Sequence, residues 1–403
     1  MKKTYRIRTV KILALALAVL LSVLALQEGP LHYWDSNVQR VTGFRLEKED
    51  SLDVVLLGAS EVINAWSAPY AYEHYGFTSY PFALSGCSDV LWYTQLEEVL
   101  DRQSPQLVVV EISGVNYERA ADLHHNSDIH YLLDDMPLSP LKLRAFSRLC
   151  SRDTDSPLCM QFPLIKYHSN WHDLKLQETA RNDRDALLRR GYAALRGGSA
   201  GMDFHSPSGG TRNVAKDRGE CDLAPEAEQA LRDFLALCER EGVEVLFVRL
   251  PHRIGVKDAE MYKQFRQINR AGRIVQEEGF RFLNLDQCPG DIGLDQTLDY
   301  SDRTHMNLSG QLKMTDWLAR YLVEECGVTP RPQTEENRQQ WEASAEYYRY
   351  YCDYMEQLKK SGTPKHLDES AELIAELDAM KAQAPAAPQP GALRTGRNQQ
   401  ERG

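Results

Sequence analysis

Four short runs of apolar residues recur along the chain, and each has the length and composition of a buried β-strand. The runs are LDVVLL (52–57), LVVVEI (107–112), VEVLFV (243–248) and FRFLNL (280–285). Their nearly continuous hydrophobicity favours a parallel sheet that is covered on both faces. TSYPFAL (78–84) is a fifth, weaker strand candidate.

Helical patterns lie between these runs. In EAEQALRDFLALCERE (226–241), apolar residues recur at the helical spacing i, i+3, i+4 and i+7. Strands that alternate with helices predict an α/β fold. The alternation breaks between about 120 and 225, a stretch too long for a simple crossover, and we expect it to form an inserted, mostly helical cap over an edge of the sheet.

Changes in composition divide the chain into segments. The tyrosine-rich stretch SAEYYRYYCDYMEQLKK (344–360) predicts a helix that packs back on the main domain, and the last twenty or so residues lack apolar periodicity. The predicted segments are a signal-anchor or transmembrane segment (1–27), a linker (28–48), the main domain with its cap (49–330), a C-terminal helical extension (331–382) and a disordered tail (383–403).

The N-terminal segment predicts export and a membrane anchor. Five basic residues precede the apolar run ILALALAVLLSVLAL (12–26), a layout typical of a secretory signal or a signal-anchor. Fifteen residues at about 1.5 Å each span roughly 22 Å, so flanking residues must help to cross a core of roughly 30 Å. LQEGPLHYW (26–34) offers no polar, flexible cleavage region, which favours an uncleaved anchor with its basic side in the cytoplasm. Cleavage would instead give a secreted protein.

Composition argues against one class of partner but does not decide whether any of the cysteines form disulfides. The formal net charge is −11, and no basic face beyond the N-terminus is available to neutralise phosphates, which argues against nucleic-acid binding. The eight cysteines are scattered and contain no CxxC pair. Cys150 and Cys159 bracket a short loop and are a candidate disulfide, although free thiols are an equal alternative.

Polar residues that suit acyl transfer follow the predicted strands, where ligands bind in open parallel sheets. Ser60 ends the first strand, Gly86 and Asn116 follow the next two, and Asp302 and His305 follow the last as Asp-x-x-His. A serine hydroxyl needs a base, which His305 supplies, and the imidazolium needs a carboxylate, which Asp302 supplies. The backbone N–H groups of Ser60 and Gly86 and the side-chain amide of Asn116 are predicted donors to the oxyanion.

These residues resemble the four sequence blocks of the SGNH/GDSL hydrolase superfamily. The blocks are Ser60 in GAS, Gly86 in SGCS, Asn116 in GVN and the Asp302/His305 pair in DRTH, in the same order. The resemblance spans roughly residues 50–325 and implies a three-layer α/β/α, flavodoxin-like catalytic domain. The anchor and the GASE block are also similar to extracytoplasmic members that act with membrane-bound O-acyltransferases, in teichoic-acid D-alanylation and alginate O-acetylation.

The chain also departs from the family pattern. Ala59 stands where the family usually has Asp, no glycine follows the serine closely, and Tyr117 replaces the Asp that often follows the third block's Asn. Simpler structural roles compete as well. Ser60 is a candidate helix N-cap, Gly86 and Asn116 are candidate turn residues, and Asp302 and His305 could cap the helix that starts in NLSGQLK, although Ser309 is its predicted N-cap.

Two further groups are candidates for substrate contact. Tyr167, His168 and Trp171 in KYHSNWHD suit either sugar stacking or ordinary packing within the cap. Arg249 and His252 in VRLPHR follow the fourth strand and could meet an anionic substrate. His124, His125 and His130 in DLHHNSDIHY match no zinc spacing, and we predict a solvated loop there and neither a metal nor a cofactor.

The sequence therefore predicts a membrane-anchored, extracytoplasmic serine esterase or O-acyltransferase. The expected partners are an acylated carbohydrate or cell-envelope polymer and, for a transferase, a membrane-bound O-acyltransferase. The alternative is a non-catalytic envelope protein that keeps the fold to bind glycan or to assist such a transferase.

Overall fold

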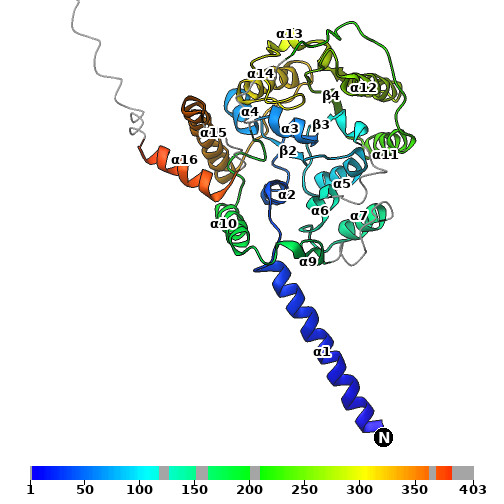
Figure 1. The fold of residues 1–403 in the computed structure, drawn as a ribbon, viewed down its shortest axis with the longest axis vertical. Helices are drawn as coiled ribbons and strands as arrows, with labels where there is room; N and C mark the ends of the chain where they lie inside the picture. The colour runs from blue at the N-terminus through cyan, green and yellow to red at the C-terminus, as the bar shows by residue number, and fades with distance from the viewer. Residues whose placement is uncertain (1, 118–126, 151–161, 200–208, 363–368, 384–403) are drawn as a thin grey trace, which may run out of the picture.

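The computed structural model describes residues 2–117, 127–150, 162–199, 209–362 and 369–383. At its centre lies a five-stranded parallel sheet with the strand order β2-β1-β3-β4-β5 (Figure 1). The strands are β1 (Val54–Gly58), β2 (Ser79–Ala83), β3 (Leu107–Glu111), β4 (Val245–Arg249) and β5 (Arg281–Asn284). All five predicted strands are present, and their order is the flavodoxin-like one, which confirms the expected α/β fold class.

Helices cover both faces of the sheet. The chain moves across the sheet in one direction from β1 to β2 and in the other direction for every later strand. Because the crossovers are right-handed, the helices between β1 and β2 lie on one face, and those of the next three connections lie on the other. Accordingly α4 packs with α14, and α11 packs with both α5 and α12. These helices are α3 (Ser60–Ala65), α4 (Ala68–Tyr75), α5 (Trp92–Arg102), α11 (Pro225–Glu241), α12 (Ala259–Glu277), α13 (Pro289–Ile292) and α14 (Leu308–Glu324).

The described parts of the cap contain helices up to residue 190, as expected, whereas residues 191–199 and 209–224 are not helical. They surround the lower part of the body, next to the end of the N-terminal helix (Figure 1). Their helices are α6 (Ser127–Leu133), α7 (Pro140–Cys150), α9 (Pro163–Lys166) and α10 (Leu174–Arg190). Cys159, half of the candidate disulfide, lies outside the described residues, as do His124 and His125.

The segment expected to be a linker contains a packed helix, α2 (Ser36–Leu46). Phe44 stacks on Phe82 of β2 with ring centroids 4.2 Å apart, and the Tyr80 hydroxyl donates to the Arg40 carbonyl at 2.8 Å. Residues 36–46 therefore belong to the body of the protein, because aromatic contacts with β2 bury one side of this helix.

The C-terminal extension also packs on the body, as predicted. It consists of α15 (Glu335–Ser361) and α16 (Ala371–Gln383). Trp341 of α15 is fully buried with its ring 5.2 Å from that of Tyr72 in α4. The Tyr348 hydroxyl donates to Gln311 of α14 at 2.9 Å. The predicted disordered tail lies almost entirely beyond the described residues.

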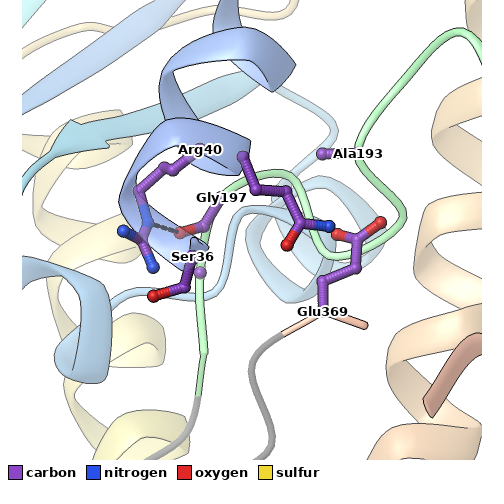
Figure 2. Close-up of a pocket in the computed structure, with 7 residues that line it drawn as sticks. Ser36, Arg40, Ala193, Gly197 and Glu369 are labelled. Carbon is purple, nitrogen blue, oxygen red and sulfur yellow. Dashed lines mark hydrogen bonds between the residues drawn. The ribbon is translucent and has the colours of Figure 1, made fainter. Parts of the chain in front are cut away.

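A buried polar junction joins α2, the end of the cap and the C-terminal extension (Figure 2). One Glu369 oxygen accepts from the Ala194 N–H and from Arg190, both at 2.7 Å, and the other accepts from the Leu195 N–H at 3.0 Å. Beside it, Arg40 donates to the Gly197 carbonyl at 2.6 Å. The space between them, about 20 Å³, has room for about one water molecule.

The N-terminal helix α1 (Lys2–Glu28) projects from the body (Figure 1). Its segment Ile7–Glu28 is long and apolar enough to cross a membrane, and the apolar window that defines it is not buried in the protein. Twenty-two residues correspond to roughly 33 Å of helix, so flanking residues supply the length that the fifteen-residue apolar run lacked.

Candidate active site

Ser60 occupies the sharp corner between β1 and α3. Gly58, the last residue of β1, has φ +147°, and an added Cβ would lie 2.7 Å from a Val62 methyl carbon and 2.8 Å from the Glu111 Cβ. The chain can therefore turn this tightly only with glycine at position 58. The N-cap of α3 is Ala59, and Ser60 is its first residue, so the predicted alternative role of Ser60 as N-cap is wrong.

The structure brings Ser60, His305 and Asp302 together in a hydrogen-bonded row. His305 Nε2 lies 2.8 Å from Ser60 Oγ, and His305 Nδ1 lies 2.7 Å from Asp302 Oδ2. Because a carboxylate only accepts, the hydrogen of the neutral imidazole is on Nδ1, which leaves Nε2 to accept from the serine hydroxyl. This is the arrangement that a general base needs in order to activate a serine.

A tight loop holds Asp302 and His305. An isolated bridge pairs Tyr300 with Met306, and within the loop Asp302 Oδ1 accepts from the backbone N–H groups of Thr304 and His305 at 2.7 and 2.8 Å. The following helix, α14, is capped by the Asn307 side chain. The prediction of Ser309 as N-cap is therefore wrong, since its hydroxyl donates to Asp299 instead.

Opposing effects set the protonation of this pair. Burial alone would raise the pKa of Asp302, but the hydrogen bond to His305, the charge of His305 and the two backbone donors hold it well below its usual value. Burial alone would lower the pKa of His305, but the hydrogen bond and charge of Asp302, with the charge of Glu61, raise it. Asp302 therefore stays ionised and stabilises the imidazolium.

Gly86 and Asn116 follow the two strands that flank β1, as predicted. Gly86 is exposed with φ +70° in the turn after β2, a conformation that glycine adopts without strain. Asn116 ends a 3₁₀ turn after β3. The two turns touch, because an added Cβ on Gly114 would lie 3.0 Å from the Cys87 carbonyl oxygen. Among the described residues, the buried Asn116 Oδ1 has no hydrogen-bond partner.

Arg249 and His252 lie at the predicted sheet edge but are buried. Arg249 is 2% exposed, donates to Asp286 at 2.9 Å and also donates to Ser113. The His252 N–H donates to Asp286 at 2.6 Å, and its Nδ1 donates to the Leu250 carbonyl at 2.7 Å. Because Arg249 already pairs with a carboxylate in the interior, its predicted contact with an anionic substrate is corrected to a structural ion pair.

A buried network next to Ser60 was not predicted. Glu61, directly after the serine, accepts from the Tyr117 hydroxyl at 2.9 Å and lies 3.5 Å from His252 Nε2. Burial would raise the pKa of Glu61, but the hydrogen bond and charge of His252 lower it. Burial and the charge of Glu61 raise the pKa of Glu111, which ends β3. The sequence held only a partial signal: Glu61 directly follows the candidate nucleophile, and Glu111 interrupts an otherwise apolar run.

A cavity of about 420 Å³ with mixed polar and apolar walls lies beside this network at the carboxyl ends of β4 and β5. Its walls include His252 and Asp286 from the buried network, together with Arg212, Asn213 and Gln296. The Arg303 carbonyl of the Asp302–His305 loop accepts from the Arg253 N–H at 2.8 Å, so the loop packs next to this wall. The cavity and Ser60 therefore share one edge of the sheet.

Tyr167, His168 and Trp171 belong to a different part of the molecule. Tyr167 stacks on Tyr33 with ring centroids 3.7 Å apart, and His168 Nδ1 bonds to the Ile165 carbonyl at 2.7 Å. Tyr33 lies five residues beyond the end of α1. Among the described residues, these contacts link the stretch to the base of α1 and not to Ser60 or His305, and substrate binding by the three side chains stays a prediction.

Metal ligation finds no support in the part of the chain that the structure describes. No group of three or more His, Cys, Asp or Glu side chains there is arranged to hold an ion. His130, expected in a solvated loop, is instead fully buried and pairs with Asp134 at 2.9 Å.

Comparisons with known proteins give only distant likenesses. No family model and no curated protein matches the chain. A crystal structure assigned as an acylhydrolase from Bacteroides fragilis is 13% identical with a TM-score of 0.33, covering 72% of this chain and 97% of its own. A family two carbohydrate esterase from Clostridium thermocellum, an active-site mutant in complex with a cello-oligosaccharide, is 10% identical with a TM-score of 0.28, covering 70% of this chain and 66% of its own. Likenesses of this size bear on neither the activity nor the substrate of this chain.

Proposed function

We propose that this chain is a membrane-anchored serine esterase or O-acyltransferase of the SGNH type. The observation that carries the proposal is the row of hydrogen bonds from Ser60 Oγ to His305 Nε2 at 2.8 Å and from His305 Nδ1 to Asp302 Oδ2 at 2.7 Å. A serine that only caps a helix has no need of a histidine and a carboxylate in this order.

In the first half-reaction Ser60 Oγ attacks the carbonyl carbon of an ester, and its proton moves to His305 Nε2. Asp302 stabilises the imidazolium that forms. The Asn116 amide and the backbone N–H groups of Ser60 and Gly86 donate to the oxyanion; precedent puts the loss of one such donor at about 10²–10³-fold in rate. When the C–O bond to the leaving alcohol breaks, His305 returns the proton to that alcohol, and an acyl-enzyme remains on Ser60.

In the second half-reaction the acceptor releases the acyl group. His305 takes a proton from the acceptor hydroxyl, the oxygen attacks the acyl carbon, and Ser60 leaves with the proton returned by His305. Water gives a free acid and makes the protein a hydrolase. A sugar or polyol hydroxyl gives a new ester and makes it a transferase.

The proposed substrate is an acylated carbohydrate or cell-envelope polymer outside the cytoplasm. The apolar segment Ile7–Glu28 supports this location, because an anchored enzyme acts most readily on material held near the membrane. A membrane-bound O-acyltransferase would be the natural acyl donor partner if the second half-reaction is transfer.

Labelling of the full-length chain in detergent with a fluorophosphonate probe tests the proposal. We expect labelling of the wild-type protein, loss of labelling in Ser60→Ala, and unchanged labelling in Ser104→Ala, which removes an exposed serine at the opposite edge of the sheet. A folded wild-type chain that the probe does not label would overturn the proposal that this chain is by itself an active serine enzyme. It would leave a non-catalytic envelope protein that binds glycan or assists a transferase.

A further inference from the structure

Outside α1, the exposed large apolar side chains are concentrated in the cap. The structure describes nine of them, and seven lie between residues 138 and 188. The seven are Leu138, Leu143, Ile165, Trp171, Leu174, Leu176 and Leu188. Exposed apolar groups gathered in one part of a fold mark a contact surface, whereas single ones scattered over a surface need no explanation.

Four of the seven belong to one short stretch, residues 163–176, which we call the cap corner. It contains α9, a 3₁₀ turn (His168–Asn170) and the first residues of α10. Leu174 is 77% exposed, and Ile165, Trp171 and Leu176 are each more than 40% exposed. The exposed Lys175 stands between the two leucines.

The cap corner lies where α1 meets the body. α9 contacts α1, and the Arg184 guanidinium of α10 donates to the Glu28 carbonyl at 2.8 Å, at the last residue of α1. His32, just after α1, bonds to the Gln27 carbonyl at 3.3 Å and pairs with Asp135 at 3.2 Å. Figure 1 shows α9 and α10 beside the end of α1 that joins the body. The helix is thus fixed to the cap.

A bilayer crossed by α1 must therefore begin next to the cap corner. Trp is enriched at the boundary between hydrocarbon and headgroups, where its ring is apolar and its N–H stays hydrated. Exposed leucine and isoleucine side chains gain by leaving water for the acyl boundary, and a lysine beside them suits anionic headgroups.

We propose that the cap corner, through Ile165, Trp171 and Leu174, inserts into the interfacial layer of the membrane that α1 crosses. The proposal rests on the anchor described under the proposed function. A second contact beside a single helix fixes the rotation of the body about α1. It gives a role to the exposed Trp171, for which the sequence left sugar stacking and packing within the cap as alternatives.

Quenching of tryptophan fluorescence by brominated lipids tests this contact. The full-length chain is reconstituted in vesicles of phosphatidylcholine and phosphatidylglycerol, with the phosphatidylcholine brominated either near the glycerol backbone or near the methyl end of its chains. We expect the Trp171→Phe variant to lose a quenched component that the wild type shows, with stronger quenching by bromines near the glycerol. Trp317→Phe is the matched control, because Trp317 lies on α14, on the far side of the body from α1 (Figure 1).

Equal quenching of the wild type and Trp171→Phe, with the chain still retained after alkaline carbonate extraction, would overturn the contact and leave the anchor intact. Release of the chain by carbonate would overturn the anchor and the contact together. Fluorophosphonate labelling of Ser60 is independent of both results, so it separates failure of the contact from failure of the proposed chemistry. Unchanged thermal unfolding of Trp171→Phe shows that its fold is retained.

Discussion

At the scale of single residues, substitution of Asp302 is the clearest test of the hydrogen-bonded triad of Ser60, His305 and Asp302. Asp302→Asn keeps the shape of the side chain but removes the charge. If its amide NH₂ group faces His305 Nδ1, it donates where the carboxylate accepted, and His305 Nε2 then carries the hydrogen and cannot accept the serine proton. We expect the second-order rate of fluorophosphonate labelling, or kcat/KM on a small ester, to fall on the order of 10³–10⁴-fold. Asp299→Asn is unsuitable as a control because Asp299 is buried, whereas the exposed Asp295→Asn leaves the row untouched. Rates equal to the wild type would contradict the role of Asp302.

The charge of Glu61 leads to a prediction about how the activity of Ser60 depends on pH. His305 must be neutral to accept the Ser60 proton, so activity is lost as the pH falls through its pKa. The negative charge of Glu61 raises that pKa together with Asp302. Glu61→Gln removes the charge, so the pKa falls and the acid limb of the labelling rate moves to lower pH.

The control for this prediction is Tyr117→Phe, which removes the hydroxyl that bonds to Glu61 at 2.9 Å but leaves the carboxylate in place. Its acid limb should stay closer to that of the wild type than the limb of Glu61→Gln. An acid limb that moves to higher pH in Glu61→Gln would refute the electrostatic role. Circular dichroism of both variants checks that the buried network tolerates the change.

At the scale of elements, the corner between β1 and α3 depends on Gly58. Gly58→Ala would place a methyl group against Val62 and Glu111 at a φ of +147°. We expect the free energy of unfolding to fall by about 2–4 kcal/mol, from backbone strain and overpacking together. Gly279→Ala has a positive φ but open space around the added methyl, so it isolates the strain, about 1 kcal/mol. If denaturant unfolding shows the same loss of unfolding free energy in Gly58→Ala and Gly279→Ala, the contact of the added methyl group with Val62 and Glu111 is unimportant.

The attachment of α16 depends on Glu369. Glu369→Ala leaves the Ala194 and Leu195 N–H groups without their acceptor, which costs about 1–3 kcal/mol. We expect faster hydrogen exchange at residues 194 and 195 and earlier protease release of α16. Glu372→Ala, at an exposed site within α16, should change neither measurement. Unchanged exchange in Glu369→Ala would mean that other contacts hold the junction.

The elements that the sequence predicted are those whose pattern is local. β1, β3 and β4 were visible because they are buried on both faces, so that each reads as a nearly continuous apolar run. β2 is equally buried, but Ser79 and Pro81 interrupt its pattern, which made it the weaker candidate. α2 was not predicted, because its polar residues Asn37 and Arg40 are buried through partners distant in the sequence, the Ser85 N–H and the Gly197 carbonyl. Ser60, Asp302 and His305 were predicted from their positions after strands. The network of Glu61, Tyr117 and His252 joins three separate segments, and no single stretch reveals it.

At the scale of the whole molecule, the basic residues at the N-terminal end of α1 predict the orientation of the chain in the membrane. The basic residues before the apolar segment predict that the N-terminus is cytoplasmic and that the body lies on the other side. Protease added to intact spheroplasts should therefore digest the body, whereas inverted vesicles should protect it. Reversing the charges of Lys2, Lys3 and Arg6 to Glu should give a mixed pattern, because the bias that sets orientation is weakened. Digestion only in inverted vesicles would place the Ser60 row in the cytoplasm and would remove extracytoplasmic polymers from its substrates.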